Sequence, residues 1–180
     1  MNKLVMFLGI LLVTTQMACA SDKKDNNEIH WMSFEEAEAK MKEKPKKVIV
    51  DVYTSWCGWC KVMDKKTYSN DSLIRYVNEN FYAVKFDAEQ KAPINFKGRK
   101  WEFSAQSRAN DLAVQLMQGK MSYPTTIFMD EGFENAQPLP GYLELFQMES
   151  ILKYIGGNSH KAKPFDEWQH DFKPAWKPKG

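Results

Sequence analysis

The sequence predicts an α/β fold with a mixed central sheet flanked by helices on both faces. Residues 47–53 and 81–87 are β-branched and nearly continuous in apolar side chains, which is typical of strands buried on both faces of a sheet. Helical segments separate these strands, so the connections are crossovers and the early strands run parallel. A third strand is followed by a tight Asp-Glu-Gly turn at 130–132, which predicts an antiparallel last pair.

Local signals predict the other elements. Ser33 is a helix N-cap with Glu36 at the capping-box position, and the helix that they start extends to 44, before Pro45. Gly119 ends the helix expected at 110–117, and Gly156-Gly157 ends the helix expected at 145–155. The turn Lys97-Gly98-Arg99 predicts a small hairpin between 94–96 and 101–103. The remaining expected elements are a short strand at 29–31, helices at 60–66, 73–80, 110–117 and 145–155, and strands at 124–129 and before Gly141.

Length and composition indicate a single globular domain. The 180 residues are 43% hydrophobic, which is enough for a core without a metal or a disulfide framework. The net charge is only +2, so nothing in the charge balance points to a nucleic-acid partner. We place the domain at 29–157, and a tail rich in lysine, proline and aromatic residues follows at 158–180.

The first twenty residues have the pattern of a signal peptide. Lys3 precedes an apolar run at 4–13 that is too short for a stable membrane anchor, and Ala18-Cys19-Ala20 fits a small-residue cleavage site. Alternatively, Cys19 is lipidated and becomes the mature N-terminus. Both interpretations predict an exported protein, periplasmic or secreted, and the second predicts a membrane-tethered lipoprotein. A flexible polar linker is expected at 21–28.

The chemistry is predicted at Cys57 and Cys60, the two cysteines that follow the predicted leader. A disulfide that closes so short a loop adds little stability, so its value lies in being made and broken. The pair follows a strand and opens a helix, whose N-terminus stabilises a thiolate. We therefore expect Cys57 to be the nucleophile, and Cys60, deeper in the helix, to be the more buried, resolving cysteine. A zinc site needs two further ligands, which no other domain cysteine supplies, so we expect neither a metal nor another cofactor.

The segment VIVDVYTSWCGWCK, residues 48–61, resembles the active-site segment of the thioredoxin superfamily. Tyr123-Pro124-Thr125 resembles the cis-proline loop of that superfamily, and Gly141 resembles the glycine that closes its last strand. The resemblance extends over about 31–155 and implies a thioredoxin-like fold, in the secreted branch with a W-C-x-W-C motif.

The resemblance also implies roles for individual residues. Pro124 would be cis, and the backbone of Tyr123 would pair with an extended substrate. Asp51 matches the buried acid that accepts the proton of the resolving cysteine, although it also fits a solvent-facing position at a strand end. The lysine partner of that acid has no clear counterpart, because Lys85 is expected to be out of register. The residues expected to contact substrate are Trp56, Gly58, Trp59, Tyr123, Pro124 and Thr125.

The predicted function is that of an exported thiol–disulfide oxidoreductase that reduces disulfides of client proteins. Trp59 stands where a cationic histidine would stabilise a thiolate, which favours a reducing pair. The expected partners are oxidised client proteins and a membrane or periplasmic electron donor. Two alternatives stay open: a disulfide oxidase or isomerase, and a redox-inactive thioredoxin-like binding module.

Overall fold

The structure is a computed structural model that describes residues 27–179. The predicted signal peptide at 1–20, Cys19 and most of the predicted linker lie outside the described residues. Within 27–179, no helix is long and apolar enough to cross a membrane.

A five-stranded mixed sheet forms the centre of the molecule, in the order β1-β3-β2-β8-β9. The three strands that come first in the chain are parallel, as expected, and β8 is antiparallel to both β2 and β9. The predicted α/β class and mixed sheet are therefore confirmed. The five strands are β1 (Trp31–Met32), β2 (Lys47–Tyr53), β3 (Phe81–Asp87), β8 (Thr125–Asp130) and β9 (Glu134–Pro140).

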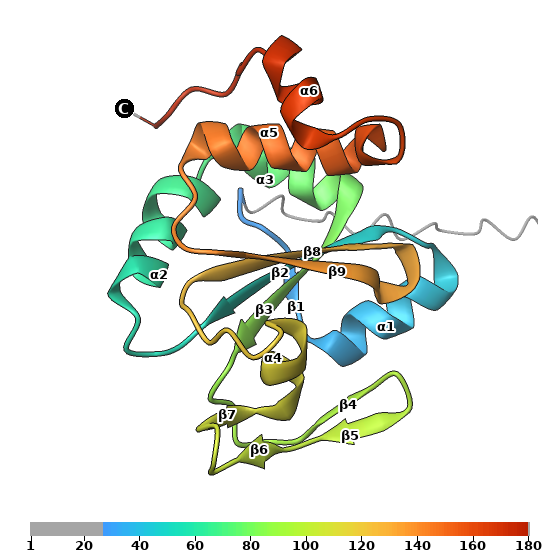
Figure 1. Ribbon diagram of the computed structural model, residues 1–180, viewed down its shortest axis with the longest axis vertical. Helices are drawn as coiled ribbons and strands as arrows, with labels where there is room; N and C mark the ends of the chain where they lie inside the picture. Colours follow the sequence, from blue (N-terminus) through green and yellow to red (C-terminus); the bar gives the residue numbers. More distant parts are fainter. Residues whose placement is uncertain (1–26, 180) are drawn as a thin grey trace, which may run out of the picture.

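Helices cover both faces of this sheet (Figure 1). One face is covered by α1 (Phe34–Glu43) and α4 (Asp111–Leu116), whose apolar side chains pack with those of Val48, Val50 and Val52 in β2. Ile49 alternates to the other face, where it packs with residues of α2 (Gly58–Met63), α3 (Asp71–Asn80) and α5 (Leu145–Gly156). Successive side chains of a strand point to opposite faces, so Asp51 points to the same face as Ile49, the face that carries α2.

The segment between β3 and α4 forms two small hairpins below the sheet in Figure 1. Lys97 and Gly98 both have positive φ angles, 51° and 70°, as a two-residue hairpin turn that matches the strand twist requires. This turn joins β4 (Ile94–Phe96) to β5 (Arg99–Trp101), so the second strand begins two residues before the predicted one. The other hairpin pairs β6 (Phe103–Ser104) with β7 (Ala109–Asn110).

The C-terminal residues fold onto α5. A helix that the sequence pattern did not predict, α6 (Phe165–Asp171), follows a 3₁₀ turn at Ser159–Lys161. Tyr154 of α5 packs edge-on against Phe165 and at a tilt against Trp168, and Trp168 stacks on Phe172 with ring centroids 4.8 Å apart. These contacts extend the α5 side of the molecule by a further layer (Figure 1).

The packing of α5 against the sheet gives a direct stability prediction. Leu152 is fully buried in the cluster beneath α5, so Leu152→Ala should lower the free energy of unfolding by about 2–5 kcal/mol. Phe146, on the same helix, is half exposed, and Phe146→Ala should cost less than about 1 kcal/mol. Urea unfolding followed by tryptophan fluorescence measures both, and equal losses would show that α5 does not pack as described.

Candidate active site

Cys57 and Cys60 lie at the start of α2 and form a disulfide, with Cα atoms 5.4 Å apart. The helix begins at Gly58, two residues earlier than predicted, because Cys57 is its N-cap. The Cys57 Sγ accepts a hydrogen bond from the Cys60 backbone N–H at 3.0 Å. A sulfur at this position faces free backbone N–H groups, which stabilise negative charge on it once the disulfide is reduced.

The two cysteines do not differ in burial in this oxidised structure. Each residue has 4% of its surface exposed, whereas Cys60 was expected to be the more buried of the two. The cross-link and the short turn keep both residues buried. Their different positions in the helix, N-cap for Cys57 and third residue for Cys60, still distinguish the two thiols.

Two exposed indoles flank the disulfide. Trp56 and Trp59 have 64% and 62% of their surface exposed, which is costly for side chains of this size unless they serve a partner. Trp56 packs edge-on against Tyr123, with ring centroids 5.8 Å apart, and donates a hydrogen bond to the Glu89 carboxylate at 3.1 Å. Trp59 lies 5.6 Å from the ring of Tyr142, so both indoles are supported from the side.

The Tyr123–Pro124 peptide bond, at the start of β8, is cis. The Pro124 carbonyl accepts a hydrogen bond from Gly141 N–H at 2.8 Å, and Gly141 has a φ of 99° that suits glycine. The Thr125 side chain is buried and donates to the Ser122 carbonyl at 2.8 Å, so it holds this loop from within. Gly58, by contrast, is exposed, with open space where a Cβ would lie.

Asp51 is buried in the middle of β2, with 2% of its surface exposed. The expectation that Lys85 is out of register was wrong: the two residues are direct partners in the parallel pairing of β2 and β3, and Lys85 Nζ lies 2.5 Å from Asp51 Oδ2. Lys85 Nζ also lies 2.5 Å from Asp64 Oδ1. The Asp64 backbone N–H donates to the Cys60 carbonyl at the end of α2, so this ion-pair network joins the buried acid to the cysteine helix.

Burial raises the pKa of Asp51 to about 6, and the nearby Lys85 charge only partly offsets this. Burial alone would lower the pKa of Lys85, but Asp51 and Asp64 together raise it. Asp51 Oδ1 has no hydrogen-bond partner within residues 27–179. Asp51 is thus a carboxylate whose affinity for a proton suits neutral pH and which has one oxygen free to accept it.

Three residues at this site were not named from the sequence. Asp64 and Tyr142 carry no motif signal, because their contacts with Lys85 and Trp59 depend on how distant segments pack. Glu89 likewise becomes visible only through its bond to Trp56. Among the described residues, no group of three or more histidine, cysteine, aspartate or glutamate side chains is arranged to hold a metal ion.

Fold and site together define a thioredoxin-fold protein with a Cys-Gly-Trp-Cys disulfide, the arrangement of a thiol–disulfide oxidoreductase. The family model Thioredox_DsbH, described as a protein of unknown function (DUF255), matches residues 15–143, and the chain belongs to this family.

Proteins similar to this chain include a relative in sequence and solved structures that share the fold. Spermatogenesis-associated protein 20 of Mus musculus is 31% identical over 144 residues, which are 79% of this chain and 16% of that relative. The chain therefore spans about a sixth of the length of this relative. A thioredoxin-fold protein from Helicobacter pylori has a TM-score of 0.54 at 20% identity, covering 80% of this chain and 82% of its own. DsbH oxidoreductase has a TM-score of 0.51 at 17% identity, covering 87% and 96%.

The raised pKa of Asp51 predicts how stability depends on pH. The folded state binds the proton of Asp51 more tightly than the unfolded state does, so stability from this group is lost as pH rises from about 4 through about 6. Asp51→Asn should therefore stabilise the protein at pH 8 by up to about 3 kcal/mol and make little difference at pH 4.

Urea unfolding at the two pH values measures this difference. Asp64→Asn is the matched control, because Asp64 contacts the same lysine but is half exposed, and it should change stability little at either pH. A stabilisation by Asp51→Asn that is equal at pH 4 and pH 8 would contradict the assignment of the pKa to Asp51.

Proposed function

We propose that the protein is an exported disulfide reductase that transfers two electrons from its Cys57–Cys60 dithiol to oxidised client proteins. The observation that carries the reducing direction is Trp59, an apolar indole at the position between the cysteines where a cation would stabilise the thiolate. A dithiol is strongly oxidising when its reduced form is stabilised, so a pair without that stabilisation favours donating electrons.

In the first step the Cys57 thiolate attacks one sulfur of a client disulfide. A bond forms between Cys57 Sγ and that sulfur, the client S–S bond breaks, and the other client sulfur leaves as a thiolate that takes up a proton. The exposed rings of Trp56 and Trp59 give the client an apolar surface on either side of the nucleophile.

In the second step Cys60 resolves the mixed disulfide. Its thiol loses a proton to Asp51, and the resulting thiolate attacks Cys57 Sγ, which forms the intramolecular disulfide and releases the second client thiolate. Asp51 suits this role because it lies on the face of β2 that carries α2, is ionised in part at neutral pH and has a free oxygen. The proton on Asp51 then passes to the second client thiolate. In total the client gains two electrons and two protons: the Cys57–Cys60 pair supplies both electrons and, through Asp51, one proton, and the solvent supplies the other proton.

Turnover requires a second dithiol partner that reduces the Cys57–Cys60 disulfide by the same exchange in reverse. We place this donor at a membrane or in the periplasm, since the pattern of residues 1–20 predicts export. Lipidation at Cys19 would tether the protein beside such a donor, and simple cleavage would release it.

The two cysteines should behave differently when each is replaced. In an insulin reduction assay with dithiothreitol, Cys57→Ser should abolish catalysis, because the N-cap thiolate that attacks the client disulfide is lost. Cys60→Ser, incubated with the client after the dithiothreitol is removed, should form a mixed disulfide that persists, visible as a reducible adduct by mass spectrometry. Ser55→Ala, an exposed change beside the motif, should keep full activity. Full activity of Cys57→Ser would refute the proposed mechanism.

A further inference from the structure

Beside the active site lies a groove of about 500 Å³ that the proposed chemistry does not use. Tyr142 lines this groove and also packs against Trp59, so the groove begins one aromatic ring away from the cysteine motif. Phe146, the third exposed large hydrophobic side chain among residues 27–179 besides the two indoles, lies in the same groove. The apolar surface around the disulfide therefore continues into a concave region.

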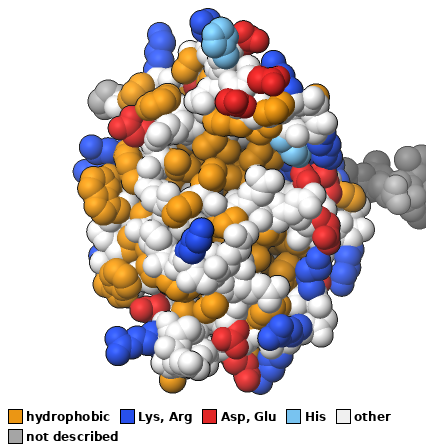
Figure 2. Space-filling model, viewed as in Figure 1, with side chains coloured by type: hydrophobic (Ala, Val, Ile, Leu, Met, Phe, Trp, Pro, Cys, Tyr) orange, Lys and Arg blue, Asp and Glu red, His pale blue; other side chains and the backbone are white. Residues whose placement is uncertain are grey.

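Lysines give this groove a positive rim. Lys65 and Lys66 line it from the π-helical turn Asp64–Tyr68 and are exposed. Neither forms an ion pair within the part of the chain that the structure describes. Glu144 is the acidic residue of the lining and the N-cap residue of α5, where its backbone N–H donates to Gln147 Oε1 at 2.9 Å. Figure 2 shows large hydrophobic side chains exposed beside lysine or arginine side chains along the edge that carries α2.

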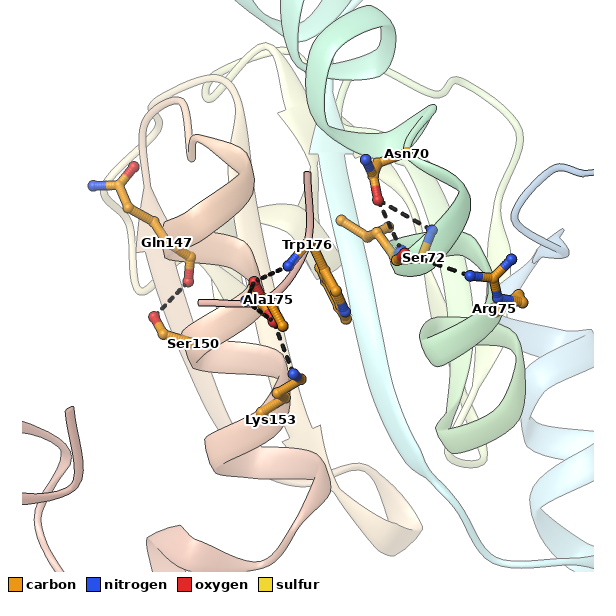
Figure 3. Close-up of polar contacts among 10 residues, drawn as sticks. Asn70, Ser72, Arg75, Gln147, Ser150, Lys153, Ala175 and Trp176 are labelled. Atoms are coloured by element: carbon orange, nitrogen blue, oxygen red, sulfur yellow. Dashed lines mark hydrogen bonds and ion pairs between the residues drawn. The ribbon is translucent and has the colours of Figure 1, made fainter. Parts of the chain in front are cut away.

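The C-terminal residues form one wall of the groove and are held there by a buried carboxylate. Glu149 of α5 has none of its surface exposed and accepts hydrogen bonds from the backbone N–H groups of Ala175 and Trp176 at 2.9–3.0 Å. Lys153 Nζ, 2.7 Å from the same carboxylate, supplies the compensating charge. In Figure 3 the segment with Ala175 and Trp176 lies between α5 and α3, with these contacts drawn as dashed lines.

Two contacts on α3 hold the last residues. Asn70, the N-cap of α3, donates to the Lys177 carbonyl at 2.7 Å, and Lys179 pairs with Asp71 at 2.8 Å. Trp176 packs against Tyr76 of α3 with ring centroids 5.7 Å apart. This segment, residues 175–179, which we call the strap, thereby places Trp176, Pro178 and Lys179 in the groove wall.

We propose that the strap and the lysine rim form a docking groove for client polypeptides that carry an apolar residue and acidic residues near the reactive disulfide. The apolar side chain would lie against Phe146 and Trp176, and the acidic side chains would pair with Lys65 and Lys66. This inference rests on the proposed reductase function, and it names the clients that the function selects.

Kinetics on two disulfide-bonded peptides test this proposal with the full-length protein. The peptides are identical except that the residues after the cysteine are Phe-Asp-Glu in one and Phe-Lys-Lys in the other. The wild-type protein should reduce the acidic peptide with a kcat/KM about tenfold higher than that of the basic peptide, since two rim charges act together. Lys65→Glu combined with Lys66→Glu should abolish or invert this ratio.

Matched variants separate the groove from overall charge and from the strap. Lys42→Glu combined with Lys44→Glu makes the same change in net charge at the C-terminal end of α1, away from α2 (Figure 1), and should keep the ratio. Glu149→Gln should release the strap, seen as faster chymotryptic cleavage after Trp176, and should lower kcat/KM for the acidic peptide. Trp176→Ala, which leaves Glu149 intact, should lower kcat/KM for the acidic peptide by about threefold or more.

Reduction of cystine separates the two claims, because so small a disulfide does not reach the groove. A protein that fails to reduce cystine would refute the reductase proposal itself. A protein that reduces cystine but treats both peptides equally would refute the docking groove alone. Sedimentation of the wild type as a dimer, and of the Lys65→Glu, Lys66→Glu variant as a monomer, would assign the groove to a second copy and overturn the proposal.

Discussion

The register between β2 and β3 places Asp51 directly opposite Lys85, and the candidate active site depends on this pairing. A carboxylate in the middle of a buried strand would be prohibitive without a partner, and Lys85 reduces that cost while leaving the pKa of Asp51 at about 6. Lys85 also pairs with Asp64, whose backbone continues the last turn of α2. One cation thus links the strand that ends at the active-site turn to the helix that begins there.

A second buried carboxylate, that of Glu149, holds the C-terminal strap in place. Glu149 occupies a core position of α5, yet its oxygens are satisfied by the backbone of the strap and by Lys153. Breaking such a network leaves buried donors without partners, so the strap is held specifically and not by apolar contact alone. Both buried acids therefore connect elements that are distant in sequence. Asp51 points to the sheet face that α2, α3 and α5 cover, and Glu149 lies in α5 on that face.

The sequence predicts those features that depend on local signals. The capping box at Ser33, the turn at Lys97-Gly98 and the apolar strands all appear in the structure, because neighbouring residues determine them. The start of α2 and the pairing of Lys85 were predicted wrongly, since an N-cap sulfur and a strand register depend on tertiary packing. Glu149 could have been flagged: Leu145, Met148 and Leu152 define an apolar helix face, and a glutamate at 149 lies within it.

The reduction potential of the Cys57–Cys60 pair is the most direct test of the central claim that this protein donates electrons. It is measured by equilibration against a graded series of dithiothreitol or glutathione buffers. Alkylation of the free thiols then distinguishes the reduced dithiol from the disulfide. The absence of a cation between the cysteines predicts a value near that of thioredoxin, about −270 mV. A value near that of a strong periplasmic oxidant, about −120 mV, would contradict the account and identify a protein that installs disulfides.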